Sequence, residues 1–458
     1  MEKHHHHERS TFSGKLGFVL SAAGASVGLG NIWRFPYLAA KYGGGIFLLI
    51  YIILALTFGY SMIIAETALG RMTRKSPVGA FGKFGKSKWL SFGGWINAVI
   101  PILIVPYYSV IGGWVIKYLI EYVKGNSQKL AEDGCFSAFI SDGTSTEICF
   151  LVFALLTLAI IFAGVRNGVE RVSKFMMPIL VFLSVLIAIY SVTRPGALAG
   201  VKYFLVPNPA NFSWMTVVAA MGQMFYSLSI AMGILVTFGS YMKRDVSIEG
   251  STTNVEIFDT AIAIMAGLMI IPAVFAFSGG DPDTLQAGPA LMFITIPKVF
   301  ANMGFGTPIG IIFFLLVLMA ALTSSIALTE SAVSTFQDEL RWPRKGATVI
   351  VGIIMVILGS LSSLGYGPLA FVKIIGMQFL DFFDFLTNSV MMPIAAFATC
   401  ILISRVIGVG KIEEEVEADG GSFKRKKVFR FMIRYLCPIF TVIILLSSVA
   451  NAFGWISM

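Results

Sequence analysis

Long apolar segments recur along this chain and constrain its fold more than any other feature. A helix needs roughly 20 apolar residues to cross the hydrocarbon core of a bilayer, which is about 30 Å thick. The chain has 458 residues, of which 56% are hydrophobic and 13% charged, whereas an ordinary soluble domain is roughly 25% charged. The apolar segments cover residues 14–40, 43–71, 90–123, 147–163, 168–193, 213–241, 254–278, 308–340, 344–365, 376–405 and 428–455. The sequence therefore predicts an all-α membrane protein with eleven transmembrane helices.

Lysine and arginine residues in the loops predict how the chain is oriented. Basic residues mark the loops after the second and the fourth segments, namely Arg71, Arg74, Lys75, Lys83, Lys86, Lys88, Arg166, Arg171 and Lys174. Acids mark the opposite loops, namely Glu132, Asp133, Asp142, Asp281 and Asp283. Short loops rich in basic residues stay in the cytoplasm, so we expect a cytoplasmic N-terminus and an extracellular C-terminus. The net charge of +9 follows from this bias, and neither a nucleic-acid partner nor an obligate protein partner is indicated.

Signatures of enzymes and of metal sites are missing from the sequence. All four histidines lie in the run 4–7, in a polar tail, which is typical of a tag or of a chance polar run. Cys135 and Cys149 flank an external loop, where a disulfide is conceivable, and Cys400 and Cys437 lie in apolar segments. Neither an HExxH nor a GxSxG motif occurs. The sequence predicts that the protein is not an enzyme.

Two apolar segments contain interruptions that a helix in lipid would avoid. The first holds Gly24, Gly28 and Gly30, followed by Asn31 and Arg34, and glycine weakens a helix by about 1 kcal/mol relative to alanine. The sixth holds Gly222, Gln223, Ser227, Ser229 and Gly233 in the middle of its span, with the break itself expected at 229–233. Unwound backbone at membrane depth must be buried in protein or line a cavity, so the two breaks are expected to face each other. Alternatively, such glycines only let helices pack closely, the interpretation we favour for Gly112 and Gly113.

The spacing of the two broken segments predicts an internal repeat. They are five helices apart, and some transporters place interrupted helices at corresponding positions of two inverted halves. We expect a tail at 1–13, one five-helix repeat at 14–193, a second at 213–405, a cytoplasmic loop at 406–427 and a last helix at 428–458.

Several motifs give the chain a recognisable family resemblance. They are the run 24–36 (GASVGLGNIWRFP) with glycines 43–45, Glu66 near the end of the second segment, the pair Tyr107 and Tyr108, residues 222–229, and residues 322–327 (LTSSIA). Together they resemble the neurotransmitter:sodium symporter family over nearly the whole chain. The resemblance is to bacterial members of the eleven-helix type that carry amino acids, and it implies a multi-pass protein of the bacterial cytoplasmic membrane.

The resemblance implies two sodium sites. Sodium is a hard cation that prefers oxygen ligands, and broken helices offer free carbonyl groups. The first ion would be held by Ser26, Asn31, Ser227 and Asp259 together with the substrate carboxylate. The second would be held by Gly24, Val27, Ala320, Thr323 and Ser324.

The resemblance also implies a site for a neutral, hydrophobic amino acid. Amides at the half-helix near Leu29 and Gly30 favour a carboxylate, to which Tyr108 would donate. Gly28 stands where amine transporters of the family carry an aspartate. The expected substrate residues are Ala25, Ser26, Gly28, Leu29, Gly30, Ile104, Tyr108, Tyr226, Ser227, Ser229, Met232, Ser324 and Leu328.

Gates on either side of this site would give alternating access. The resemblance pairs Arg34 with Asp384 outside, each expected to have the other as partner, and Arg9 with Asp338 inside, helped by Tyr241. Phe12 replaces the tryptophan that usually follows the inner arginine. Gly168 and Pro178 match a family spacing that lets the fifth helix unwind.

Chloride is not expected to be required. Asp259 stands where many members of the family have a neutral asparagine, and a fixed carboxylate beside a cation supplies the charge that chloride would supply. Two other function classes are weighed: a sensor that binds without transport, and an intramembrane enzyme. The second lacks a buried histidine beside Ser324 or Tyr108, and sodium-driven accumulation in liposomes distinguishes the first.

Overall fold

The protein is a bundle of long helices. The structure is a computed structural model that describes residues 10–281, 285 and 288–456. Over these residues the chain is helical apart from its loops and an isolated bridge between Ile374 and Met377. The expected all-α architecture is therefore confirmed.

Nine continuous helical stretches of the described residues are long and apolar enough to cross a membrane. They are Gly45–Thr73, Lys88–Val123 (α6), Gly143–Phe162 (α9), Val165–Val192, Ile248–Ser278 (α14), Gly306–Leu340 (α16), Arg344–Leu364 (α17), Phe379–Ile407 and Lys426–Ala452. Within these stretches lie α3 (Gly45–Leu54), α4 (Tyr60–Thr73), α10 (Arg171–Val192), α18 (Phe379–Asp384), α19 (Met392–Ile401), α21 (Lys426–Phe431) and α22 (Cys437–Ala452).

The first predicted segment is a broken helix. Helix α1 (Lys15–Ser26) ends just before Gly28, and a π-helical turn (Gly30–Arg34) leads into α2 (Phe35–Lys41). The two parts are bent by 55° and count as a tenth crossing if they are taken together.

The sixth predicted segment is broken as well, at residues 228–233. Helix α12 (Trp214–Ser227) ends there and α13 (Ile234–Tyr241) begins, and each is shorter than a full crossing. Ser229, Ala231 and Gly233 all adopt positive φ. The expected break at 229–233 is thus confirmed, whereas Gly222 and Gln223 do not interrupt the helix, because both lie inside α12. The count of eleven crossings and the inverted repeat stay predictions.

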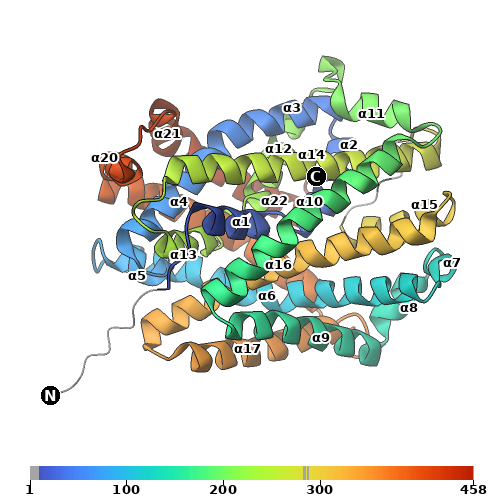
Figure 1. Cartoon of the computed structure of the whole chain (residues 1–458), viewed down its shortest axis with the longest axis horizontal. Coiled ribbons are helices and arrows are strands. Elements are labelled where there is room, and N and C mark those ends of the chain that lie inside the picture. Colours follow the sequence, from blue (N-terminus) through green and yellow to red (C-terminus); the bar gives the residue numbers. More distant parts are fainter. Residues whose placement is uncertain (1–9, 282–284, 286–287, 457–458) are drawn as a thin grey trace.

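Shorter helices gather at the two ends of the bundle. Figure 1 shows α5 (Pro77–Gly82) and α20 (Val409–Val416) at one end, with α7 (Ser127–Leu130), α8 (Cys135–Ser141), α11 (Ala197–Leu205) and α15 (Ile296–Ala301) at the other. The basic loop with Lys83, Lys86 and Lys88 follows α5, whereas Glu132 and Asp133 lie between α7 and α8. The two kinds of loop charge thus lie at opposite ends, as the sequence predicted.

Other sequence predictions have mixed outcomes in the structure. Cys135 and Cys149 are both free thiols, so the conceivable disulfide is not formed. The fifth segment is helical throughout, with Gly168 in a π-helical turn (Val165–Glu170) and Pro178 inside α10. Arg9, Asp283 and the histidine run lie outside the described residues.

Helix α13 is held close to α4 by two glycines. A Cβ atom added to Gly70 would lie 2.0 Å from the Val236 carbonyl oxygen, and one added to Gly239 would lie 2.3 Å from that of Thr67. Because these contacts are between backbones, no flexible side chain can move aside.

We predict that Gly70→Ala destabilises the protein. The added methyl would push α13 away from α4, and overpacking of this kind costs about 1–3 kcal/mol. The measurement is the melting temperature of the purified protein in detergent. The matched control is Gly82→Ala, because Gly82 has no atom within 4 Å of the added Cβ. Equal melting temperatures for the two variants would show that this close approach is not needed.

Candidate functional site

A small central pocket lies between the two helix breaks. It encloses about 30 Å³, room for roughly one water molecule. Every residue that the sequence predicted for the substrate site lines it, together with Asn31 and Ile234. The lining residues are Ala25, Ser26, Gly28, Leu29, Gly30, Asn31, Ile104, Tyr108, Tyr226, Ser227, Ser229, Met232, Ile234, Ser324 and Leu328.

The two breaks contact each other directly, and side chains of neighbouring helices also bind the backbone around the first break. Ser229 Oγ donates to the Ala25 carbonyl at 3.1 Å, and Gln223 Nε2 donates to the Gly30 carbonyl at 3.1 Å. Ser324 Oγ, on α16, donates to the same Ala25 carbonyl at 3.1 Å. These bonds replace those that an unbroken helix would make, and they confirm that the breaks face each other.

Asp259 lies on α14 beside the first break, with its side chain fully buried. Its carboxylate accepts hydrogen bonds from Asn31 Nδ2 at 2.9 Å, from Ser227 Oγ at 2.9 Å and from the Tyr51 hydroxyl at 3.1 Å. Among the described residues, no lysine or arginine forms an ion pair with it. Asp259 is therefore an acid shielded from solvent whose hydrogen-bond partners are all uncharged.

One buried oxygen atom beside Asp259 lacks a hydrogen-bond partner among the described residues. Asn31 Oδ1 makes no hydrogen bond to any described residue, and leaving a buried acceptor unsatisfied costs about 1–3 kcal/mol. A carboxylate without a basic partner next to a free carbonyl oxygen is a donor set that fits a small cation.

The residues expected to hold a second ion lie where α1 ends against α16. A Cβ added to Gly24 would lie 3.2 Å from the Thr323 Cβ, and Ser324 Oγ donates to the Gly24 carbonyl at 3.3 Å. Thr323 Oγ1 donates to the Ala320 carbonyl at 3.1 Å. Val27 is the residue at which α1 ends.

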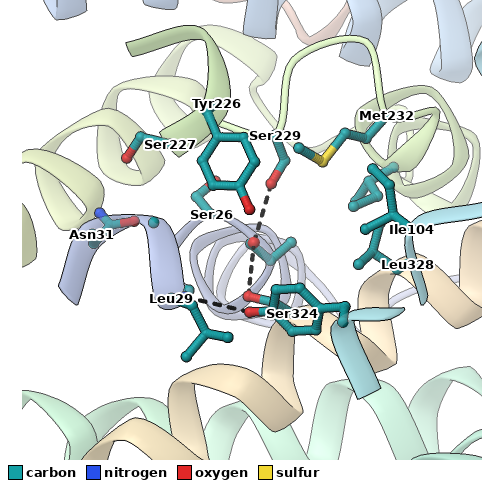
Figure 2. A pocket seen from close by; sticks show the side chains of 15 residues that line it. Ser26, Leu29, Asn31, Ile104, Tyr226, Ser227, Ser229, Met232, Ser324 and Leu328 are labelled. Carbon is teal, nitrogen blue, oxygen red and sulfur yellow. Dashed lines mark hydrogen bonds between the residues drawn. The ribbon is translucent and has the colours of Figure 1, made fainter. Parts of the chain in front are cut away.

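The central pocket has a polar side and an apolar side. Figure 2 shows Asn31 and Ser227 on one side and Ile104, Met232 and Leu328 on the other. The Leu29 amide donates to the Tyr108 hydroxyl at 3.3 Å. A ligand with one charged and one apolar end would match this arrangement.

A larger vestibule lies beyond Tyr226. It encloses about 300 Å³, and both Arg34 and Asp384 line it. No direct ion pair joins these two charges among the described residues, so their pairing as an outer gate stays a prediction. The Arg34 guanidinium lies 5.3 Å from the centre of the Tyr226 ring, and Asp384 accepts a hydrogen bond from the Tyr107 hydroxyl at 3.3 Å. The vestibule gives both charges access to water, which weakens the need to pair.

The other side of the pocket is closed by packed and hydrogen-bonded residues. Phe12 is buried against Phe238 and Tyr241, at ring distances of 5.4 and 5.9 Å. The Asp338 carboxylate accepts a hydrogen bond from the Ser76 amide at 2.6 Å.

Glu330 is a buried acid on this side that sequence reasoning missed. It accepts a hydrogen bond from the Tyr241 hydroxyl at 2.7 Å and pairs with Arg344 at 2.5 Å. The sequence does contain a signal for this residue, because an acid inside an apolar segment is unusual. Ile234 was missed as well, although it directly follows the second break.

Comparison with known proteins identifies the family of this chain. The family model of the sodium:neurotransmitter symporter family matches residues 9–149 and 139–454, which is nearly the whole chain. The chain belongs to the sodium:neurotransmitter symporter family. It is therefore a sodium-dependent membrane transporter and not an enzyme.

Relatives and a solved structure are similar over most of their length. The chain is 34% identical to an uncharacterized sodium-dependent transporter, YhdH, of Bacillus subtilis, over 96% of this chain and 97% of that one. It is 27% identical to the mouse sodium- and chloride-dependent GABA transporter 2, over 90% of this chain and 75% of that one. The crystal structure of MhsT in complex with L-phenylalanine is 35% identical, with a TM-score of 0.84 over 96% of this chain and all of that one. The symporter fold is thus shared.

Proposed function

We propose that this protein is a sodium-coupled symporter of neutral, hydrophobic amino acids that works by alternating access. The observation that carries the proposal is the Asp259 carboxylate, which is fully buried and has no basic partner among the described residues. A buried charge is expensive unless it is paired. A sodium ion held by Asp259, Asn31, Ser227 and the Ser26 carbonyl would supply the missing positive charge.

A second sodium ion would bind where α1 meets α16. Its ligands would be the carbonyl oxygens of Gly24, Val27 and Ala320 and the hydroxyl oxygens of Thr323 and Ser324. The hydroxyls of Thr323 and Ser324 now donate to backbone carbonyls, so their oxygen lone pairs are available to a cation. An ion here would join the end of α1 to α16.

The substrate we propose is an amino acid with an apolar side chain. Its carboxylate would lie near the Leu29 and Gly30 amides and the Tyr108 hydroxyl, next to the first sodium ion. Its side chain would lie against Ile104, Met232 and Leu328. The L-phenylalanine in the similar MhsT structure supports this choice. Because the pocket encloses about 30 Å³, its walls must move to admit such a molecule, and methionine adapts readily.

Access would alternate between the vestibule and the opposite side. Tyr226 lines both the pocket and the vestibule, so its movement would open the outer path and an Arg34–Asp384 pair would close it. Arg9, Asp338 and Tyr241 would close the inner path, and unwinding between Gly168 and Pro178 would release the second sodium ion. We place the protein in the bacterial cytoplasmic membrane with its N-terminus inside.

The first test is whether sodium supports amino-acid binding. L-Phenylalanine is expected to bind roughly tenfold or more tightly in sodium than in potassium, because coupling energies of 1–3 kcal/mol are typical of linked sites. Binding of the labelled amino acid to purified protein measures this directly. Equal affinity in the two salts would contradict the proposal.

The second test concerns chloride. We propose that the Asp259 carboxylate supplies the negative charge that an anion would otherwise supply, unlike in the GABA transporter relative. Replacing chloride with gluconate is then expected to leave uptake unchanged. The Asp259→Asn variant should lose sodium affinity by roughly tenfold or more, or gain a chloride requirement.

The matched control for this test is Asp245→Asn, which removes one exposed carboxylate away from the pocket. It should behave as the wild type in both salts. If wild-type uptake already fails in gluconate, the charge argument is wrong and Asp259 has another role.

A further inference from the structure

The segment that runs from the end of α4 through α5 to the start of α6 carries positive charges that the transport site does not use. Residues 71–94 include six basic side chains and no acid. Three of the six are engaged with the protein itself: Arg71 bonds Glu415, Arg74 bonds the Met242 carbonyl, and Lys83 bonds the Met72 carbonyl. Lys86 and Lys88 are exposed, and among the described residues no acid forms an ion pair with either.

Three acidic side chains at this end of the bundle are already paired elsewhere. Glu413 pairs with Arg430 at 2.8 Å, and Glu417 pairs with Lys426 at 3.2 Å. Glu415 pairs with Arg71 at 2.6 Å. Glu413, Glu415 and Glu417 are therefore not set to neutralise Lys86 and Lys88.

An exposed aromatic face continues directly from these lysines. Ser87 caps α6, with its hydroxyl accepting a hydrogen bond from the Leu90 amide at 3.3 Å, and Lys88 is the first residue of the helix. Trp89, Phe92 and Trp95 follow at a spacing of three, which places them on one side of the helix. They are 82%, 49% and 45% exposed, and the rings of Trp89 and Phe92 are in edge contact at 6.5 Å.

The depth of this aromatic face in the membrane indicates what kind of molecule it binds. Helix α6 is one of the membrane-crossing helices, so its first turns lie where the bilayer meets water. Tryptophan is enriched at that depth because its ring is apolar and its N–H is polar. Basic residues next to such a face attract anionic headgroups.

We propose that Lys86 and Lys88, with Trp89, Phe92 and Trp95, form a docking surface for an anionic phospholipid. The phosphate group lies between the two ammonium groups, and an acyl chain runs along the aromatic face into the bilayer. The partner is a lipid and not a free phosphate ion, because the charged and apolar parts of the surface are continuous. The proposal does not depend on which substrate the protein carries.

The experiment is a lipid competition on the full-length purified protein. The protein in detergent micelles is mixed with equal amounts of phosphatidylglycerol and phosphatidylcholine, and the lipids it retains are counted by native mass spectrometry. The wild type is expected to prefer phosphatidylglycerol. In the Lys86→Gln, Lys88→Gln double variant this preference should fall about fivefold for each lysine removed.

The matched control removes two lysines at the opposite end, as Lys129→Gln with Lys202→Gln. Both side chains are exposed and, among the described residues, neither forms an ion pair. This control should keep the wild-type preference, whereas Trp89→Ala should retain less phosphatidylglycerol. An equal preference in the two double variants would overturn the proposal. Displacement of the lipid by glycerol phosphate alone would also overturn it, because the aromatic face would then contribute nothing.

Discussion

The contact between Asp259 and the two broken helices is the interaction on which the rest of the site depends. Asn31 belongs to the turn after the first break and Ser227 ends the helix before the second break. Both bond the same carboxylate, at 2.9 Å each. One buried acid therefore fixes the distance between two segments that are nearly two hundred residues apart in sequence.

The breaks themselves are possible because neighbouring helices satisfy their backbone groups. Ser324 from α16, Tyr108 from α6 and Gln223 from α12 each bond the unwound backbone around the first break. In the second break, the Ala231 amide donates a hydrogen bond to Glu66 on α4 at 2.8 Å. Lipid could not supply these partners. The polar groups of the pocket are thus structural requirements of the breaks as well as candidate ligands.

Much of this site could be predicted from sequence, in part from local signals and in part from the family resemblance. The glycines at 24–30 predicted the first break, and the resemblance implied the residues that line the central pocket, with the exception of Ile234. Gly222 and Gln223 misled, since a single glycine inside a helix costs only about 1 kcal/mol relative to alanine and does not by itself break it. A Cβ added to Gly222 would meet only the Arg34 side chain, at 3.8 Å.

The parts that could not be predicted depend on distances between helices. Sequence placed Arg34 and Asp384 on the same side of the pocket, but it did not reveal the vestibule of about 300 Å³ that both of them line. It also did not reveal that Tyr241 bonds Glu330, because that contact requires α13 and α16 to be placed side by side. Such contacts depend on the packing of whole helices and leave no short motif.

The central claim is that one site couples sodium to an amino acid, and accumulation tests it most directly. The purified protein is placed in liposomes with sodium outside and potassium inside, and uptake of labelled L-phenylalanine is followed over time. We predict that the amino acid rises above its external concentration inside the liposomes and leaves again when a sodium ionophore removes the gradient. Uptake that stops at the external concentration, or that is the same with and without the sodium gradient, would contradict the account.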